Sequence, residues 1–112
     1  MQKKRRQQHG KSILHKHDGT CYLCMLDGDD RQKRNVQKHH IYGGPNRWKA
    51  EAEGFFVWLC PEHHQTGPAA VHASAHPEGI GNNRRLKRIC QQEYEKTHTR
   101  EEFMKLIGRS YL

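Results

Sequence analysis

Two pairs of metal-ligating residue types occur in the sequence, Cys21-x-x-Cys24 and Cys60-x-x-His63, with 35 residues between them. Two intervening residues let both side chains of a pair reach one ion, so two such pairs can complete a tetrahedral site. Three thiolates and one imidazole suit zinc. The sequence therefore predicts a structural zinc ion, whose binding would contribute about 10–16 kcal/mol to folding.

An alternative for this set is that the thiols are reduced and simply buried. The fourth cysteine, Cys90, has no partner at ligand spacing and shares a helical apolar face with Leu86, Ile89 and Tyr94. This pattern indicates a core residue, and the alternative is that Cys90 replaces His63 in the zinc site.

Histidines form a second group, because six of the ten lie between residues 39 and 76. If His63 binds zinc, its neighbour His64 is free to face the strand that carries His39 and His40. Such a cluster could hold a second metal ion while one neutral imidazole acts as a general base. Phosphodiester hydrolysis uses this combination, since a metal polarises the phosphate and a base activates water.

The run Cys21-x-x-Cys24, His39-His40-Ile41 and Leu59-Cys60-Pro61-Glu62-His63-His64 resembles the HNH, or ββα-metal, endonucleases. The resemblance is to the zinc-containing, phage endonuclease VII-like branch, and it covers residues 12–76 well and the tail more loosely. It implies that His40 is the general base. It also implies that His39, His64 and His72 bind a catalytic Mg²⁺, Mn²⁺, Ni²⁺ or Zn²⁺ ion, with His76 as the alternative to His72.

Two features depart from the family pattern. The middle Asn of the HNH name is replaced by Gly54-Phe55, and Asn46 in the preceding loop is the candidate substitute. Adjacent strand residues point to opposite faces. His39 and His40 therefore serve one site only if the strand ends or twists beside Gly43-Gly44.

Local patterns predict the elements that position these residues. They are a turn or short helix over 12–17, a tight knuckle at 21–24, strands over 35–42 and 55–59, a helical turn over 48–53, a short helix from 61, and helices after 77 and 99. Thr99 and Glu102 have the spacing of a capping box.

These elements predict an α+β fold, and the resemblance implies a small zinc-stapled ββα-metal core with flanking C-terminal helices. We expect a flexible basic arm over 1–11, the core over 12–78 and a C-terminal helical extension over 79–112. The hydrophobic fraction of 33% is low, which favours a metal-stabilised domain.

The net charge of +8 lies on the flanks of the chain: residues 1–20 carry +5, residues 21–64 carry zero and residues 65–112 carry +3. Such a distribution favours a polyanionic partner, DNA above all. Candidate contacts are Arg47, Lys49 and the run Arg84-Arg85-Lys87-Arg88, with Trp48 as a stacking surface. The alternative is a solvated helix face for that run and a core position for Trp48. Solvated side chains are expected for His9, His15, His17 and His98.

No apolar run approaches the length needed to span a bilayer, so we expect an intracellular protein. The resemblance to phage-type HNH proteins implies the cytoplasm of a bacterial host cell and a phage or prophage gene. The predicted function is a metal-dependent HNH endonuclease acting on DNA. The sequence leaves the oligomeric state open, and a homodimer is one arrangement that would cut both strands. The alternative is a catalytically inactive, zinc-stapled module that binds nucleic acid or protein, for example a phage-encoded inhibitor.

Overall fold

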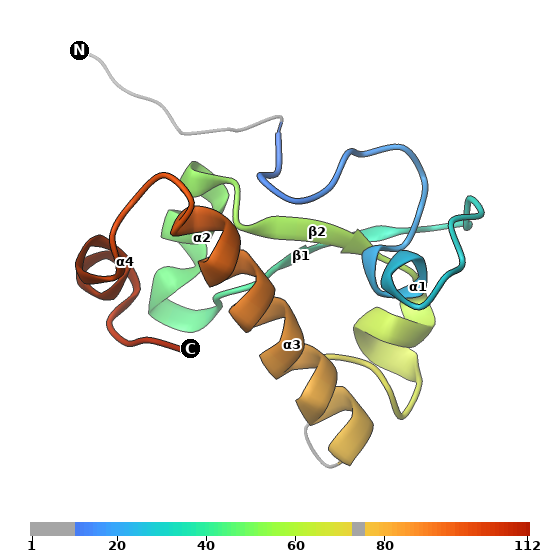
Figure 1. The fold of residues 1–112 in the computed structure, drawn as a ribbon. Coiled ribbons are helices and arrows are strands. Elements are labelled where there is room, and N and C mark those ends of the chain that lie inside the picture. The colour runs from blue at the N-terminus through green and yellow to red at the C-terminus, as the bar shows by residue number, and fades with distance from the viewer. Residues whose placement is uncertain (1–10, 73–75) are drawn as a thin grey trace.

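Two short antiparallel strands lie at the centre of the computed structural model, which describes residues 11–72 and 76–112. Helix α3 crosses beside the sheet, with α1 near one end of it and α2 and α4 near the other (Figure 1). In chain order the elements are α1 (Tyr22–Leu26), β1 (Gln37–His40), the 3-10 turn η1 (Gly44–Asn46), α2 (Arg47–Glu53), β2 (Phe56–Leu59), the π-helix η2 (Glu62–Thr66), α3 (Pro77–Tyr94) and α4 (Arg100–Ile107). The predicted α+β class is confirmed.

The strand register decides which side chains share a face. Gln37 pairs with Leu59 and His40 pairs with Phe56, and both strands are regular. Opposed residues of an antiparallel pair lie on the same face, and successive residues alternate. One face therefore carries Gln37, His39, Val57 and Leu59, and the other carries Lys38, His40, Phe56 and Trp58.

Residue type explains how the hairpin forms. β2 reads Phe-Val-Trp-Leu, and all four residues are buried, as expected for aromatic and β-branched residues in a covered strand. Gly54 ends α2 with φ +80°, and a Cβ at this position would lie 2.8 Å from the carbonyl oxygen of Lys11. Both the left-handed backbone and the close approach therefore require glycine.

The core joins the sheet to both C-terminal helices. Leu86 and Cys90 of α3 and Phe103 and Ile107 of α4 belong to the same buried cluster as the strand residues. The segment predicted as a helical extension thus supplies part of the only core found among the described residues. Cys90 is fully buried and lies outside the cysteine–histidine group, which confirms its prediction as a core residue.

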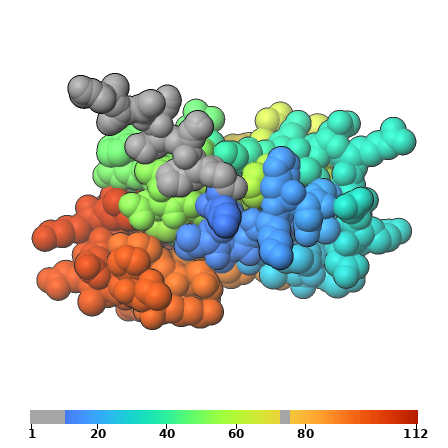
Figure 2. All heavy atoms as spheres, turned by 90° about the horizontal axis from the view of Figure 1, so that it is seen from above, coloured from blue at the N-terminus to red at the C-terminus, as the bar shows by residue number. Residues whose placement is uncertain are grey.

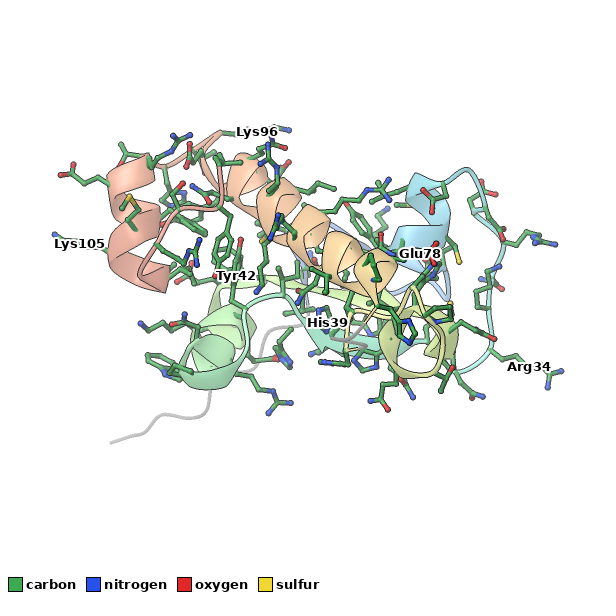
Figure 3. All side chains as sticks on the ribbon, turned by 90° about the horizontal axis from the view of Figure 1, so that it is seen from below. Arg34, His39, Tyr42, Glu78, Lys96 and Lys105 are labelled. Carbon is green, nitrogen blue, oxygen red and sulfur yellow. The ribbon has the colours of Figure 1, made fainter. Side chains whose placement is uncertain are left out.

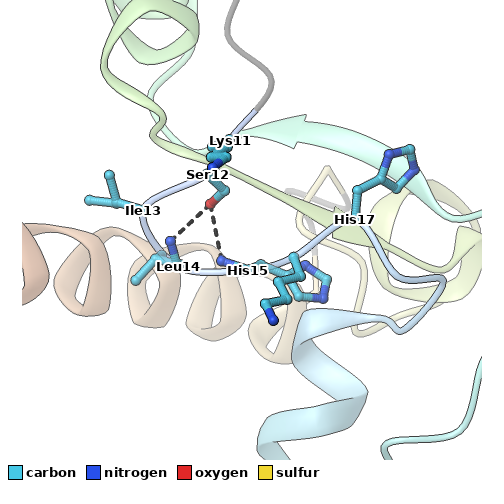
Figure 4. Close-up of a pocket in the computed structure, with 7 residues that line it drawn as sticks. Lys11, Ser12, Ile13, Leu14, His15 and His17 are labelled. Carbon is cyan, nitrogen blue, oxygen red and sulfur yellow. Dashed lines mark hydrogen bonds between the residues drawn. The ribbon is translucent and has the colours of Figure 1, made fainter.

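The segment over residues 12–17 (Figure 4) packs on the face of the sheet that carries Phe56 and Trp58. The hydroxyl of Ser12 accepts hydrogen bonds from the backbone N–H groups of Leu14 and His15. The prediction that His15 is solvated is wrong, because only 7% of it is exposed. Its Nδ1 accepts from the backbone N–H of Trp58 at 3.1 Å, and its Nε2 lies 2.9 Å from the Thr20 hydroxyl. In Figure 2 this segment (blue) lies beside the green residues of α2 and β2.

Several local predictions differ from the structure in extent. The Cys21–Cys24 knuckle is the start of helix α1, residues 12–17 form bends without a helix, and β1 is shorter than the predicted strand over 35–42. The capping box is confirmed, because the Thr99 hydroxyl accepts from the Glu102 N–H while the Glu102 carboxylate accepts from the Thr99 N–H. No helix within 11–72 and 76–112 combines the length and the apolar character needed to cross a membrane.

Candidate metal centres

Cys21, Cys24, Cys60 and His63 converge on one point. The Nδ1 atom of His63 lies 3.4 Å from the sulfur of Cys21, 3.4 Å from that of Cys24 and 3.5 Å from that of Cys60. The sulfurs of Cys24 and Cys60 are 3.9 Å apart. A regular tetrahedron with zinc bonds of about 2.3 Å to sulfur and about 2.05 Å to nitrogen has edges of about 3.5 Å and about 3.8 Å. The group therefore has the dimensions to hold a metal ion such as zinc.

Short-range backbone geometry builds this site. Cys21 precedes the first turn of α1, so that Cys24 lies one turn further along the same helix. Cys60 directly follows β2, and its carbonyl oxygen accepts hydrogen bonds from the N–H groups of His63 at 3.0 Å and His64 at 2.9 Å. That tight turn brings His63 back over Cys60, which explains why the x-x spacing predicted the site.

The electrostatics of the group favour a bound cation. Burial, together with the neighbouring thiols of Cys21 and Cys60, raises the pKa of Cys24 to about 12. Burial also raises the pKa of Cys60. Thiolates packed together in a buried site repel one another, and a divalent ion offsets that repulsion.

A second group consists of three imidazoles from three different segments. His39 comes from β1, His64 from η2 and His72 from the chain after it, and their ligand atoms all lie within 4.8 Å of one another. The Nε2 atoms of His64 and His72 are 3.2 Å apart. Metal–nitrogen bonds of about 2.1 Å would place two ligand atoms about 3.0 Å apart in octahedral and about 3.4 Å apart in tetrahedral geometry. The spacing fits a shared ion.

Within this cluster, one nitrogen of His39 lacks a polar partner. Its Nε2 atom is buried and has no hydrogen-bond partner among the described residues. Burial, followed by the proximity of His64 and His72, lowers the pKa of His39 to about 3, so the ring is neutral near pH 7. A neutral imidazole with an unused nitrogen is the form that binds a metal.

Gln37 fixes the orientation of His64. The side-chain oxygen of Gln37 lies 2.6 Å from Nδ1 of His64 and accepts a hydrogen bond from its N–H group. Nε2 is then the unprotonated nitrogen, and it points toward His72. Such an outer contact to a ligand histidine selects the tautomer that coordinates a metal.

His40 is not part of the trihistidine cluster. Since β1 remains a regular strand, His40 lies on the face opposite to His39, and its Nε2 is 2.6 Å from the Glu51 carboxylate of α2. Although burial opposes it, the hydrogen bonds from His40 and Lys38 lower the pKa of Glu51, so the carboxylate is charged. Among the described residues, Nδ1 of His40 has no hydrogen-bond partner.

His40 and the cluster nevertheless border one hollow, of about 310 Å³. Its walls include His39, His40, His72 and Asn46, together with Lys87 and Tyr111 from the C-terminal part. Figure 3 shows His39 and Tyr42 on the side of the sheet that faces α3. The sequence-predicted base and two of the predicted metal ligands are thus reachable from the same space.

The other predicted site residues fall in different places. Asn46 uses its amide to donate to the carbonyl of Ile107 at 2.9 Å, and Lys49 donates to the carbonyl of Leu106 at 2.8 Å. Arg47 and Trp48 are exposed, Trp48 by 68%. His76 is exposed and outside the metal-ligand groups, whereas His72 belongs to one of them.

The two predicted arginines of α3 point to different surroundings. Arg84 lines a groove beside the C-terminal segment, while Arg85 lies 3.3 Å from Asp27 and pairs with it. Helical rotation of about 100° per residue separates neighbours in this way.

Sequence patterns did not predict the roles of Glu51 and Gln37, whereas Lys87 belongs to the basic run that they indicated as a phosphate contact. Helical spacing places Glu51 on α2, but only the docking of α2 beside β1 brings it to His40. No sequence signal linked Gln37 to His64 across 27 residues. Lys87 follows Arg84 by about one helical turn, which is a usable signal for a shared face.

Comparisons of the chain with known protein families, with curated protein sequences and with solved structures find no match.

Proposed function

We propose that this protein is a metal-dependent endonuclease of the HNH, ββα-metal type that hydrolyses phosphodiester bonds in DNA. The observation that carries the proposal is the convergence of His39, His64 and His72, two of which, His39 and His72, line a hollow that His40 also borders. The motif order along the chain, with the His-His pair on β1 and His64 on η2, supports the assignment of the ββα-metal fold.

His39, His64 and His72 would hold the catalytic divalent ion, which supplies Lewis acidity at the scissile phosphate and at the leaving oxygen when bound. The orphaned Nε2 of His39 and the tautomer that Gln37 fixes in His64 support this role. Cys21, Cys24, Cys60 and His63 would hold a separate, structural zinc ion, since four protein ligands leave no open position for substrate.

His40 would act as the general base through Nδ1. The Nε2–H group of His40 donates to Glu51, which leaves Nδ1 to accept a proton from water. The water oxygen then bonds to phosphorus as the bond from phosphorus to the sugar oxygen breaks, and the departing oxygen takes up a proton. Glu51 would hold the ring in place and stabilise the imidazolium that forms, as carboxylates do beside catalytic histidines.

The proposed setting is the reducing cytoplasm of a bacterial cell, with the gene carried by a phage or prophage. Four cysteines without a disulfide among the described residues suit that compartment. The net charge of +8 supports a polyanionic substrate.

A plasmid-nicking assay tests the proposal. We expect wild-type, zinc-loaded protein to convert supercoiled plasmid to the open circle in the presence of Mg²⁺, Mn²⁺, Ni²⁺ or Zn²⁺, and His40→Ala to lose at least about 10²-fold in rate. His98→Ala, a substitution of an exposed histidine stacked on Tyr94, is the matched control and should cut like the wild type. No cleavage with any metal, or equal cleavage by His40→Ala, would contradict the proposal.

The second candidate function is a zinc-stapled binding module without catalysis. The observation that favours it concerns Asn46, the candidate replacement for the missing motif Asn. Its side-chain amide donates a hydrogen bond to the carbonyl of Ile107. Under this alternative the folded, zinc-loaded protein binds nucleic acid or protein but cuts no plasmid, and the nicking assay separates the two functions.

A further inference from the structure

A groove of about 490 Å³ runs between the outer face of α3 and the C-terminal segment that follows α4. Ile80, Arg84, Lys87 and Arg88 line it from α3 at helical spacing, and Arg109 lines it from the other side. No aspartate or glutamate side chain is among the residues that line this groove. The charged side chains that line it are therefore all cations.

These cations are not neutralised within the protein. No ion pair joins Arg84, Lys87, Arg88 or Arg109 to a carboxylate in the described part of the chain, whereas Arg31, Arg85 and Arg100 each pair with one. Burial and the nearby charge of Arg109 lower the pKa of Lys87. A gathering of like charges opposes folding, and binding of a polyanion would relieve that repulsion.

The wall that carries Arg109 is held in place. The backbone N–H of Tyr111 donates to Gln91 at 2.7 Å, and Gln91 donates to the Ser110 hydroxyl at 3.0 Å. Gln91 is itself fully buried in α3. The groove is therefore a fixed feature of the fold.

Tyr111 adds an aromatic surface to this wall. Its ring lies 4.7 Å from the Arg109 guanidinium and 5.2 Å from the Lys87 ammonium, and it packs against Tyr42. Cations arranged around an aromatic ring are typical of surfaces that bind a nucleic-acid strand, where the cations contact phosphates and the ring contacts a sugar or base.

The groove continues into the hollow at the histidines. Asn83, Lys87 and Tyr111 line both spaces, and the hollow is also lined by His39, His40 and His72. A polyanionic chain lying in the groove would thus reach the hollow beside His39, His40 and His72, with Lys87 on the wall that the two spaces share.

We propose that the groove between α3 and the C-terminal segment binds the sugar–phosphate backbone of a nucleic-acid strand, through Arg84, Arg88 and Arg109, and leads it to the histidines. Contacts to phosphates alone carry no sequence information, so the binding is independent of base sequence. The inference rests on the proposed function only for the destination of the strand; the binding itself is independent of cleavage.

The experiment measures binding without cleavage. Fluorescence anisotropy of labelled single-stranded and duplex oligonucleotides is followed over a series of salt concentrations, in a His40→Ala background and without added divalent metal. Arg84→Ala/Arg88→Ala and Arg109→Ala are compared with Arg85→Ala. This control lies on the same helix as Arg84 and Arg88 and removes one charge, as Arg109→Ala does, but from a residue paired with Asp27. Circular dichroism and zinc content verify that each variant is folded.

We expect Arg84→Ala/Arg88→Ala to bind at least about tenfold more weakly at low salt. Because two phosphate contacts are lost, the plot of log K against log salt should become less steep, by about 1.4 for single strands or about 1.8 for duplex. Arg109→Ala should reduce the steepness of this plot by about half as much, and by the same amount for oligonucleotides of unrelated sequence. Arg85→Ala should leave the steepness unchanged. Unaltered binding in both groove variants, or an equal loss in Arg85→Ala, would overturn the inference. Groove-dependent binding by a wild-type protein that cuts no plasmid would refute the proposed nuclease and keep the groove.

Discussion

Replacing one zinc ligand should remove most of the stability of this domain. Among the cysteines, Cys24→Ala is the informative change, because Cys24 lies within 3.4 Å of His63 Nδ1 and 3.9 Å of the Cys60 sulfur. Cys90→Ala is its matched control, since Cys90 is fully buried but outside the ligand group. Both variants lose one thiol, and only the first loses a ligand.

The magnitude follows from the size of the chain. At about 0.05–0.15 kcal/mol per residue, a domain of 112 residues has a total stability of about 6–17 kcal/mol. A structural zinc contributes about 10–16 kcal/mol, a quantity as large as that total. We therefore expect Cys24→Ala to be largely unfolded at 25 °C, whereas Cys90→Ala should lose about 1–3 kcal/mol, as buried truncations do.

The assay combines zinc content with urea denaturation followed by circular dichroism. Wild type and Cys90→Ala should each retain one tightly bound zinc ion, and Cys24→Ala should retain none. His64→Ala removes one imidazole of the trihistidine cluster and should retain as much zinc as the wild type, which separates the two candidate metal centres. A Cys24→Ala protein with the wild-type unfolding midpoint, or a strong chelator that leaves the dichroism unchanged, would refute the reasoning.

Three further predictions concern His15, Gly54 and Glu51. Burial lowers the pKa of His15 despite the nearby Asp18 carboxylate, so the unfolded chain binds a proton more readily than the folded one. Stability should therefore fall as the pH drops below about 6.5. Urea denaturation across pH should show a smaller fall in His15→Asn, and identical pH profiles of the two proteins would contradict this. Gly54→Ala should cost more stability in the same assay than Gly28→Ala, because both have positive φ but only Gly54 would place a Cβ against the Lys11 carbonyl; equal costs would refute the steric argument. Glu51→Gln should slow plasmid nicking by about 10–100-fold without changing the metal concentration needed, and an unchanged rate would show that the contact with His40 has no role in positioning it.

Local patterns account for what the sequence predicted well. The cysteine–histidine pairs require only a helix start and a tight turn, and the capping box at Thr99 spans a single helical turn. Hydrophobic and aromatic composition located β2, and the spacing around Cys90 identified a core face. Each of these features depends on residues close together along the chain.

Features that depend on tertiary packing could not be predicted in this way. The burial of His15 follows from the docking of its segment on Trp58, and the pairing of Glu51 with His40 follows from the placement of α2. The position of Arg109 beside Lys87 depends on the path of the chain after α4. Helical rotation predicts that Arg84 and Arg85 point to different sides of α3. Which of the two faces the groove and which pairs with Asp27 depends on how the rest of the chain packs around the helix.

The three imidazoles and His40 would form a hydrolytic centre, and the rate of plasmid nicking as a function of Mn²⁺ concentration tests this proposal most directly. The wild type should show a rate that saturates with metal, and His64→Ala should need at least about tenfold more Mn²⁺ and cut more slowly while keeping its structural zinc. His76→Ala, at an exposed histidine outside the metal-ligand groups, should match the wild type. Identical Mn²⁺ dependence in wild type and His64→Ala would contradict the account.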